Sequence, residues 1–373
     1  MSNSRSMSSV VEPGRIELAR RRRGLTQRAL ADQLGVTPRT VSRYEKDGAP
    51  LDIAPSLAAV LDFPALYFSK PLAVDEVEGR VEFRAARSST KREQAAAKAS
   101  RVHGGEIDDW VIENLSVPGL ELPDLEGASP VEAANEIRYS WALKPGPLPN
   151  LIQLFESKGV HVYGIPSLGK RVDAFSTWYR DRPLVYLGFQ KTPERSRFDA
   201  AHELGHLLMH RNASTFTDVE KEKQADEFAS EFLIPRSAIL GTLPYNPSVN
   251  GLLKFRSAFK VSAMAVAKSA YSAGLLSDWN YRQTVMSLSK RGFRSSEPGG
   301  MVQQERSRIF GHLFDRSRTT RMTVNRLAEL LHLPAEDVHG LTLRTEIRAV
   351  GGNAAQSSAS QPSGEPGHLR LVQ

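Results

Sequence analysis

Residues 202–206, which read His-Glu-Leu-Gly-His, constrain the fold and chemistry of this chain more than any other segment. Residues four apart on an α-helix share a face, so His202 and His206 can present two imidazoles to one zinc ion while Glu203 stands beside the metal as a general base. Apolar and small residues throughout 197–210 form a stripe that would bury such a helix. The segment therefore predicts a buried helix carrying part of a zinc site.

A third metal ligand must come from elsewhere in the chain. A catalytic zinc ion usually takes three protein ligands and leaves a fourth position for water. The chain has no cysteine, so the third ligand must be His, Asp or Glu. His210 lies a further turn along the helix axis, too far from an ion held by His202 and His206. The metzincin spacing needs a third histidine six residues after His206, but position 212 is Asn. We therefore expect His210 to be a helix-end residue.

A second helix is predicted over residues 220–235, where it ends at a proline. Glu222 and Asp226 lie four apart at the margin of its apolar stripe. This spacing resembles the Glu-x-x-x-Asp arrangement of the gluzincin peptidases, which implies Glu222 as third ligand and Asp226 as a partner that orients a histidine. Glu220 and Glu227 are the alternatives to Glu222.

Such a ligand set predicts peptide hydrolysis. Zinc lowers the pKa of bound water and polarises a carbonyl oxygen, so Glu203 can take the proton of the attacking water. Many sites of this kind use a further His or Tyr to stabilise the oxyanion, but no histidine occurs between His210 and His312. Tyr245, Tyr271 or no tyrosine could fill that role.

Residues 25–45 predict two short helices around a glycine turn. Thr26 is a plausible N-cap, Gly35 marks the turn, and Thr37 followed by Pro38 suits the start of the second helix. This stretch closely resembles the helix-turn-helix of the XRE (phage-repressor type) family. The resemblance implies binding to double-stranded DNA, as a homodimer that reads two half-sites.

The second of these helices would enter a major groove, with the preceding helix near the DNA backbone. The candidate DNA-binding residues are Gln27, Thr37, Arg39, Thr40 and Arg43.

Charge agrees with that prediction. Residues 1–50 hold ten Lys or Arg against five Asp or Glu, so they supply +5 of the formal net charge of +7. A basic surface favours contact with phosphates, and we expect the run 20–23 to face them. The alternative is a small helical dimerisation or protein-binding domain with a solvated basic face.

Composition and hydropathy limit the other possibilities. With 373 residues, 40% of them hydrophobic and 24% charged, the chain can form two or three domains with ordinary cores. No apolar run reaches the length of a membrane span and no signal peptide is found, so a cytoplasmic protein without a membrane partner is expected. The absence of cysteine excludes disulfides and thiolate metal sites. No internal repeat is evident.

The rest of the chain predicts further helices and a few strands. Residues 82–113 are helical and basic in pattern, and three short strands are expected at 160–163, 172–179 and 183–187. The strand just before the zinc helix could offer an edge to which an extended peptide adds, or could be plain core.

The predicted fold class is mainly α with a small β-sheet (α+β). The predicted organisation, in chain order, is a helix-turn-helix domain at 11–70, a helical connector at 71–125, a gluzincin-like zinc metallopeptidase domain at 126–245, its helical extension at 246–300, a helical C-terminal region at 301–350 and a disordered tail at 351–373.

Together these segments resemble an XRE regulator fused to an ImmA/IrrE-type metallopeptidase domain. The residues that carry the second resemblance are 83–85, 149–151, 159–162, 173–175, 197–206 and 222–235. The resemblance implies a DNA-binding transcriptional regulator with a zinc-dependent endopeptidase that cleaves an XRE-type repressor, or itself, in a stress or mobile-element response. The alternative is a non-catalytic transcription factor or antitoxin-like regulator whose metallopeptidase fold senses a ligand or binds a partner.

Overall fold

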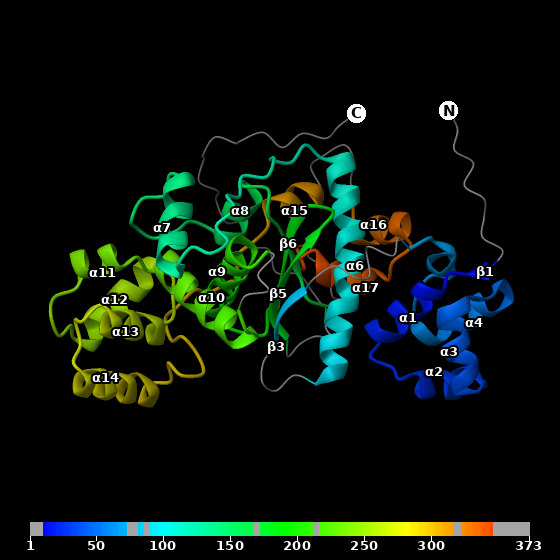
Figure 1. Ribbon diagram of the computed structural model, residues 1–373, viewed down its shortest axis with the longest axis horizontal. Helices are drawn as coiled ribbons and strands as arrows, with labels where there is room; N and C mark the ends of the chain where they lie inside the picture. The colour runs from blue at the N-terminus through cyan, green and yellow to red at the C-terminus, as the bar shows by residue number, and fades with distance from the viewer. Residues whose placement is uncertain are drawn as a thin grey trace, which may run out of the picture.

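The computed structural model describes residues 10–72, 90–166, 172–211, 216–315 and 322–345, and the backbone of residues 81–85. These residues are mainly helical with two small sheets, so the predicted α+β class is confirmed. The tail predicted at 351–373 lies outside the described residues. Figure 1 shows an N-terminal helical domain on one side of the long helix α6 (Lys91–Asn114) and the larger sheet on the other.

The N-terminal domain forms the two helices and the turn that its sequence predicts. The side chain of Thr26 accepts a hydrogen bond from the N–H of Ala29, and that of Thr37 accepts one from the N–H of Thr40. Gly35 ends the first of these helices at φ 68°, in the left-handed region that favours glycine. The elements, in chain order, are β1 (Val10–Val11), α1 (Pro13–Arg22), α2 (Gln27–Leu34), α3 (Pro38–Asp47), β2 (Ala49–Pro50), the 3₁₀ turn Leu51–Ile53, α4 (Ala54–Leu61) and the 3₁₀ turn Ala65–Ser69.

Helix α6 begins later than predicted. Thr90 and Glu93 form a capping box, in which each side chain accepts a hydrogen bond from the other residue's backbone N–H. The prediction of a helix from residue 82 is wrong at its start, because residues 81–85 form strand β3 (Val81–Ala85). Helix propensity is a property of one segment, so it does not reveal that the segment pairs with a strand far away in the sequence.

The larger sheet has the strand order β3-β5-β6-β4. Strand β4 (His161–Gly164) is parallel to β6 (Arg182–Leu187), whereas β5 (Val172–Tyr179) is antiparallel to both β6 and β3. The three strands predicted between residues 160 and 187 are therefore present. Because β6 is an interior strand, the expectation that the strand just before the zinc helix offers an edge is wrong.

Alternate residues of the sheet face two hydrophobic cores. Ala174 and Val185 belong to the core that α9 (Pro193–Met209) and α10 (Asp218–Leu233) cover. Phe175 and Tyr186 stack with ring centroids 4.5 Å apart and belong to the core shared with α6 and the N-terminal domain. On this second face the helix and the sheet approach closely, since a Cβ atom at Gly104 would collide with Tyr186. The sheet thus separates α9 and α10 from the N-terminal domain.

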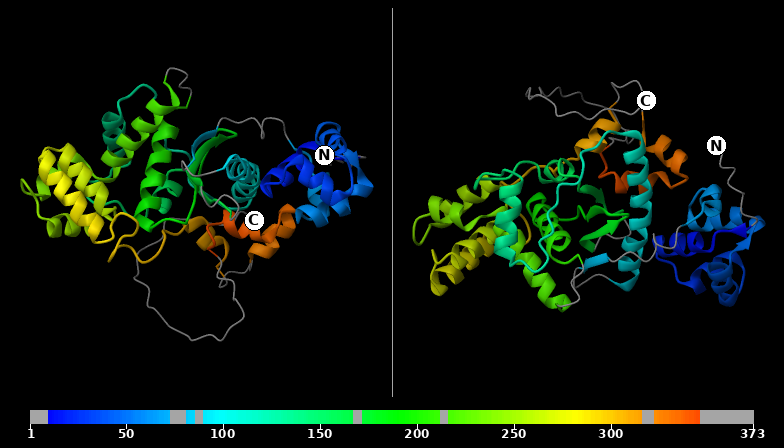
Figure 2. Two further views of the ribbon diagram at one scale, coloured as in Figure 1. Left: turned by 90° about the horizontal axis from the view of Figure 1, so that it is seen from below. Right: turned by 45° about the horizontal axis from the view of Figure 1, so that its top comes forward.

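The remaining helices extend the two ends of the molecule. Helices α11 to α14 continue the core on the α9 and α10 side, whereas α15 to α17 return to the sheet and the N-terminal domain (Figure 2). Their bounds are α7 (Pro130–Ser140), α8 (Leu151–Glu156), α11 (Arg236–Thr242), α12 (Val249–Phe259), α13 (Ala263–Ser272), α14 (Asp278–Lys290), α15 (Arg308–Leu313), α16 (Val324–Leu331) and α17 (Ala335–Leu341).

Helices α16 and α17 repeat the pattern of α2 and α3, so the expectation of no internal repeat is wrong. Thr323 caps α16 as Thr26 caps α2, and His332 ends it at φ 56°, where Gly35 ends α2. Buried Leu-Ala pairs and a buried valine in the second helix follow at equal spacing in both segments. A histidine replaces the glycine of the turn, so the strongest sequence signal for this motif is missing.

The basic run at 20–23 faces acids of the protein, so its prediction as a phosphate-facing run is wrong for most of its members. Arg20 pairs with Glu45, and Arg22 pairs with Asp337 of α17 through two bonds of 2.7 and 3.1 Å. Arg23 lies 3.2 Å from the same carboxylate. Helix α1 is thereby joined to α17 by a buried ion pair.

Candidate metal centre and DNA-binding helix

Helices α9 and α10 bring two histidines and one glutamate together. The ligand atoms of His202, His206 and Glu222 all lie within 4.8 Å of one another. The Nε2 atom of His206 is 3.2 Å from Oε1 of Glu222, and that of His202 is 3.5 Å from Oε2. Both imidazoles are buried, whereas the Glu222 side chain is 40% exposed. The cluster is therefore a possible metal site with one open side.

The other two acids considered as third ligand have different partners. The carboxylate of Glu220 accepts hydrogen bonds from the N–H and the hydroxyl of Thr217, which form the capping box of α10. Glu227 lies on the exposed side of the helix, 3.9 Å from Lys223. Of the three acids, the structure places Glu222 beside the histidines.

Asp226 determines which nitrogen of His202 faces the cluster. Its Oδ1 atom is 2.9 Å from Nδ1 of His202. A carboxylate accepts the proton on Nδ1, so Nε2 carries a lone pair directed at Glu222.

A second chain of contacts orients His206. Gln224 accepts a hydrogen bond from Nε2 of His210 at 2.8 Å, which leaves Nδ1 of His210 as an acceptor. That atom lies 2.9 Å from Nδ1 of His206, which donates to it. His210 is the C-cap of α9, as its predicted place at the helix end requires. Its contact with His206 was not predicted, although a third histidine at the four-residue spacing is a signal for it.

The donor set fits a divalent metal ion such as zinc. Two imidazole lone pairs and a carboxylate converge, and the protons on both Nδ1 atoms already point away toward Asp226 and His210. The two Nε2 atoms lie 3.0 Å apart, so a proton on one of them, or a cation bound to all three groups, can lie between these acceptors. Burial by itself would raise the pKa of Glu222, but the two adjacent histidines hold that pKa well below its usual range.

Glu203 lies beside this cluster in a buried position. The hydroxyl of Ser176 on β5 donates to its Oε2 atom at 2.7 Å. Its Oε1 atom is buried and has no hydrogen-bond partner among the described residues. Burial raises the pKa of the Glu203 carboxyl, although the neighbouring His206 and His202 oppose the shift. A carboxylate with a raised pKa and one unpaired oxygen suits proton transfer.

Nothing in the part of the chain that the structure describes identifies an oxyanion donor. Tyr271 donates its hydroxyl proton to Asp278 and stacks on Tyr281, and Tyr245 is 73% exposed. The role considered for either tyrosine therefore stays open.

Comparison with known families matches two parts of the chain. The sequence model described as helix-turn-helix matches residues 16–68, and the peptidase model described as IrrE N-terminal-like domain matches residues 155–271. The chain joins a helix-turn-helix domain to an IrrE-type peptidase domain. No curated protein matches the chain. The finer boundaries of the six predicted segments stay predictions.

The helix-turn-helix domain exposes the helix predicted to contact DNA. Arg39 and Arg43 of α3 are exposed, and Thr40 is partly buried. Thr37 caps the helix, and the Gln27 side chain donates to Glu45 at 2.7 Å. The face of α3 that carries the two arginines is therefore open, whereas Gln27 already has a partner within the domain.

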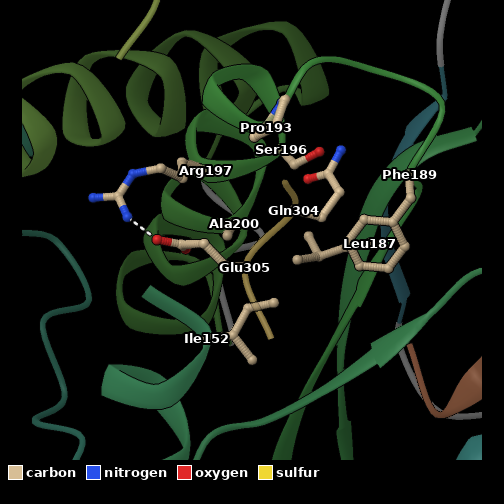
Figure 3. Close-up of a pocket in the computed structure, with 9 residues that line it drawn as sticks. All are labelled: Ile152, Leu187, Phe189, Pro193, Ser196, Arg197, Ala200, Gln304 and Glu305. Carbon is tan, nitrogen blue, oxygen red and sulfur yellow. Dashed lines mark hydrogen bonds and ion pairs between the residues drawn. The ribbon is translucent and has the colours of Figure 1, made fainter. Parts of the chain in front are cut away.

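The segment after residue 300 packs against the start of α9 in the peptidase domain. Figure 3 shows Glu305 and Arg197 pointing toward each other across a pocket that Ile152 and Leu187 also line. The Arg197 guanidinium and the Glu305 carboxylate form a buried ion pair. With a volume of about 10 Å³, this pocket has room for at most one water molecule. The pocket is a gap in the packing between this segment and α9, and its lining residues do not include the metal cluster.

Among the described residues, no helix has both the length and the apolar character needed to cross a membrane.

Neutral replacement of Arg39 and Arg43 tests the DNA-binding helix. We expect the double variant Arg39→Gln, Arg43→Gln to bind operator DNA at least tenfold more weakly and with a shallower salt dependence, because each arginine that contacts a phosphate releases counterions. Fluorescence anisotropy at several salt concentrations measures both quantities. Arg326→Gln, at an exposed position on α16, is the control. Unchanged affinity and salt slope in the double variant would show that α3 does not carry the contacts.

Replacement of His210 tests the chain of contacts behind His206. We expect His210→Ala to weaken zinc binding by about 10–100-fold, since groups that orient a metal-binding histidine commonly contribute that much. Gln224→Ala should weaken it in the same direction but less, because it acts one bond further away. Competition with a chromogenic chelator measures the affinities. Equal affinities in the wild type and His210→Ala would leave His210 as a helix cap alone.

Proposed function

We propose that this DNA-binding regulator carries a zinc-dependent endopeptidase. The observation that supports the proposal is the convergence of His202, His206 and Glu222 beside the buried carboxylate of Glu203. In this proposal the first three residues bind zinc, Asp226 orients His202, and Glu203 is the catalytic base. Arg39, Arg43 and Thr40 contact DNA, with Thr37 and Gln27 supporting them.

The arrangement suits proton transfer during peptide hydrolysis. When bound, zinc lowers the pKa of a coordinated water and polarises the scissile carbonyl. Oε1 of Glu203 accepts the proton of the attacking water and returns it to the leaving amine. The Ser176 hydroxyl of β5 binds Oε2 of Glu203, which leaves the other oxygen, Oε1, without a hydrogen-bond partner among the described residues. Asp226 and His210 keep both imidazoles in the tautomer that binds a cation.

The substrate we propose is a protein of the regulator's own system. An XRE-type repressor or the chain itself is the candidate, cleaved in a stress or mobile-element response in the cytoplasm. The regulator would bind DNA as a homodimer, because helix-turn-helix domains commonly read two half-sites.

A non-catalytic function is the second candidate. The same fold could sense a ligand or bind a partner while the helix-turn-helix domain binds DNA. One observation favours this function: the helix-turn-helix domain and the peptidase domain are parts of the same chain. A buried ion pair also joins α1 of the helix-turn-helix domain to α17.

Incubation of the purified, zinc-loaded full chain distinguishes the two functions. It should be incubated alone and with any XRE-type repressor encoded beside it, and the products identified by intact-mass spectrometry. Discrete fragments that are absent with Glu203→Gln support the peptidase. Identical mass spectra for the wild type and Glu203→Gln, with intact DNA binding in both, support the non-catalytic regulator.

A further inference from the structure

We propose that a pocket beside the metal cluster takes an acidic side chain of the substrate, and that Lys268 and Arg195 select it. The inference rests on the proposed peptidase function and names a class of residue that the substrate carries near the cleaved bond. Four observations lead to it: the position of the pocket, its size and apolar wall, the two cations that line it and the opposite charge of the hollow next to it.

The pocket lies where α9, α10, α13 and α14 meet, next to the metal cluster. Asp226, whose Oδ1 atom is 2.9 Å from Nδ1 of His202, lines it from α10. Phe198 lines it from α9, four residues before His202, which is about 6 Å along the helix axis. Successive residues of an extended peptide are about 3.3 Å apart, so a side chain one or two positions from the cleaved bond can reach the pocket.

The pocket has the size and the apolar wall of a binding site. Its volume is about 390 Å³, within the range of about 300–1,000 Å³ that is usual for small-ligand sites. Met264 and Ala265 of α13 and Tyr281 and Val285 of α14 are partly buried and line it. Burial of the methylene groups of a side chain against these residues would stabilise its binding.

Positive charge exceeds negative charge among the groups that line the pocket. These groups are Lys191, Arg195, Lys268, Asp199 and Asp226. Both carboxylates already have partners, since Oδ2 of Asp199 lies 2.9 Å from Nζ of Lys191 and Asp226 accepts a hydrogen bond from His202. An additional carboxylate in the pocket would therefore meet the two remaining cations.

Arg195 and Lys268 are these two cations. The Arg195 guanidinium donates to the backbone carbonyl of Arg294, and Lys268 is exposed. Among the described residues, neither forms an ion pair with a carboxylate. Hydrogen bonds between charged groups are stronger than those to neutral ones, so the pocket favours Glu or Asp over Gln or Asn.

The hollow next to this pocket has the opposite charge. It has a volume of about 360 Å³ and shares Asp226 and Lys268 with the pocket. Glu227 and Glu231 line it together with Arg236, whose guanidinium already donates to two backbone carbonyls. An acidic side chain is therefore repelled by this hollow and favoured in the pocket beside α9.

Met264 provides a signal at the pocket that does not depend on hydrolysis. The full chain is labelled with methionine that carries a carbon-13 methyl group, loaded with zinc and prepared as Glu203→Gln to prevent cleavage. Its Met264 resonance, assigned with Met264→Leu, is followed by NMR during titration with acetyl-Ala-Glu-Ala-amide or acetyl-Ala-Gln-Ala-amide. Lys268→Glu is compared in this background with Lys254→Glu, which changes an exposed lysine of α12 outside the pocket. Zinc content is measured on every sample.

We expect the Glu peptide to bind about fivefold more tightly than the Gln peptide, which is the size of a partly screened ion pair. Lys268→Glu should abolish this preference, and Lys254→Glu should retain it. A Met264 signal that the Glu peptide does not shift, equal affinities of the two peptides, or a preference that Lys268→Glu leaves unchanged would overturn the inference.

Hydrolysis is measured separately with a library of random peptides. The zinc-loaded protein with Glu203 intact is incubated with the library, and the residues around each cut are identified by mass spectrometry. Acidic residues enriched within two positions of the cuts, in the wild type and Lys254→Glu but not in Lys268→Glu, support the inference, whereas cuts without this enrichment overturn it. Absence of cleavage together with a Glu preference at Met264 would contradict the peptidase proposal but support the pocket as a site for acidic side chains, so the two failures are distinguishable.

Discussion

Glu203→Gln is expected to lower the rate of peptide hydrolysis by about 10²–10⁴-fold while leaving bound zinc unchanged. Glutamine has nearly the same shape as glutamate but cannot accept and return a proton at the Oε1 position. The bond from Ser176 to the other oxygen can persist, so the side chain should stay in place. Initial rates of fragment formation, with zinc content measured on the same samples, test the prediction.

Ser176→Ala is the companion variant. It keeps the carboxylate but removes the hydroxyl that positions it, so we expect a smaller loss of rate than in Glu203→Gln and normal zinc content. Hydrolysis by Glu203→Gln at the wild-type rate would exclude Glu203 as the base. A larger loss of hydrolysis rate in Ser176→Ala than in Glu203→Gln would show that the Glu203 carboxylate is not the catalytic base.

Asp337→Asn is expected to lower the free energy of unfolding by about 3 kcal/mol, because the change leaves the buried guanidinium of Arg22 without a counter-charge. The side chains of Asp337 and Arg22 are each 3% exposed. Urea denaturation measures the loss, and hydrogen exchange should localise it to α1 and α17.

Asp62→Asn is the matched control for this ion pair. Asp62 also contacts Arg23, but its side chain is 91% exposed, so water screens the interaction. Asparagine also tolerates the left-handed backbone at this position. We expect a change in stability of less than about 1 kcal/mol. If Asp337→Asn changed the free energy of unfolding as little as Asp62→Asn, the contact between α1 and α17 would not contribute to stability.

Spacing along single helices predicted much of the candidate site. His202 and His206 share a face of α9 because four residues make about one helical turn, and the same spacing singled out Glu222 and Asp226 on α10. These relations are local, so they can be read without knowing the tertiary fold. The caps at Thr26 and Thr37 are local in the same way, and the structure confirms them.

Contacts between distant segments were not predictable in this way. Ser176 reaches Glu203 from a strand, and Gln224 reaches His210 from another helix. No local pattern marks either residue. The assignment of residues 81–85 as helix failed for the same reason, because their partner strand lies about ninety residues later in the sequence.

The C-terminal region illustrates a different difficulty. Its repeat of the α2 and α3 pattern keeps the threonine cap and the buried positions but has His332 at the left-handed turn residue. The run at 20–23 shows that a cluster of positive charge does not identify its partner. Arg22 neutralises an acid more than three hundred residues away, which only the fold brings within reach.

Zinc content of the purified full chain tests the central claim most directly. After loading with zinc and removal of excess metal, we expect about one zinc ion per wild-type chain by mass spectrometry, and close to none in His202→Ala and Glu222→Ala. Glu220→Ala is the control, because Glu220 caps α10 rather than facing the histidines, and it should retain the wild-type content. A wild-type protein that remains free of metal, or a Glu222→Ala variant that binds as much zinc as the wild type, would contradict the proposed metal centre.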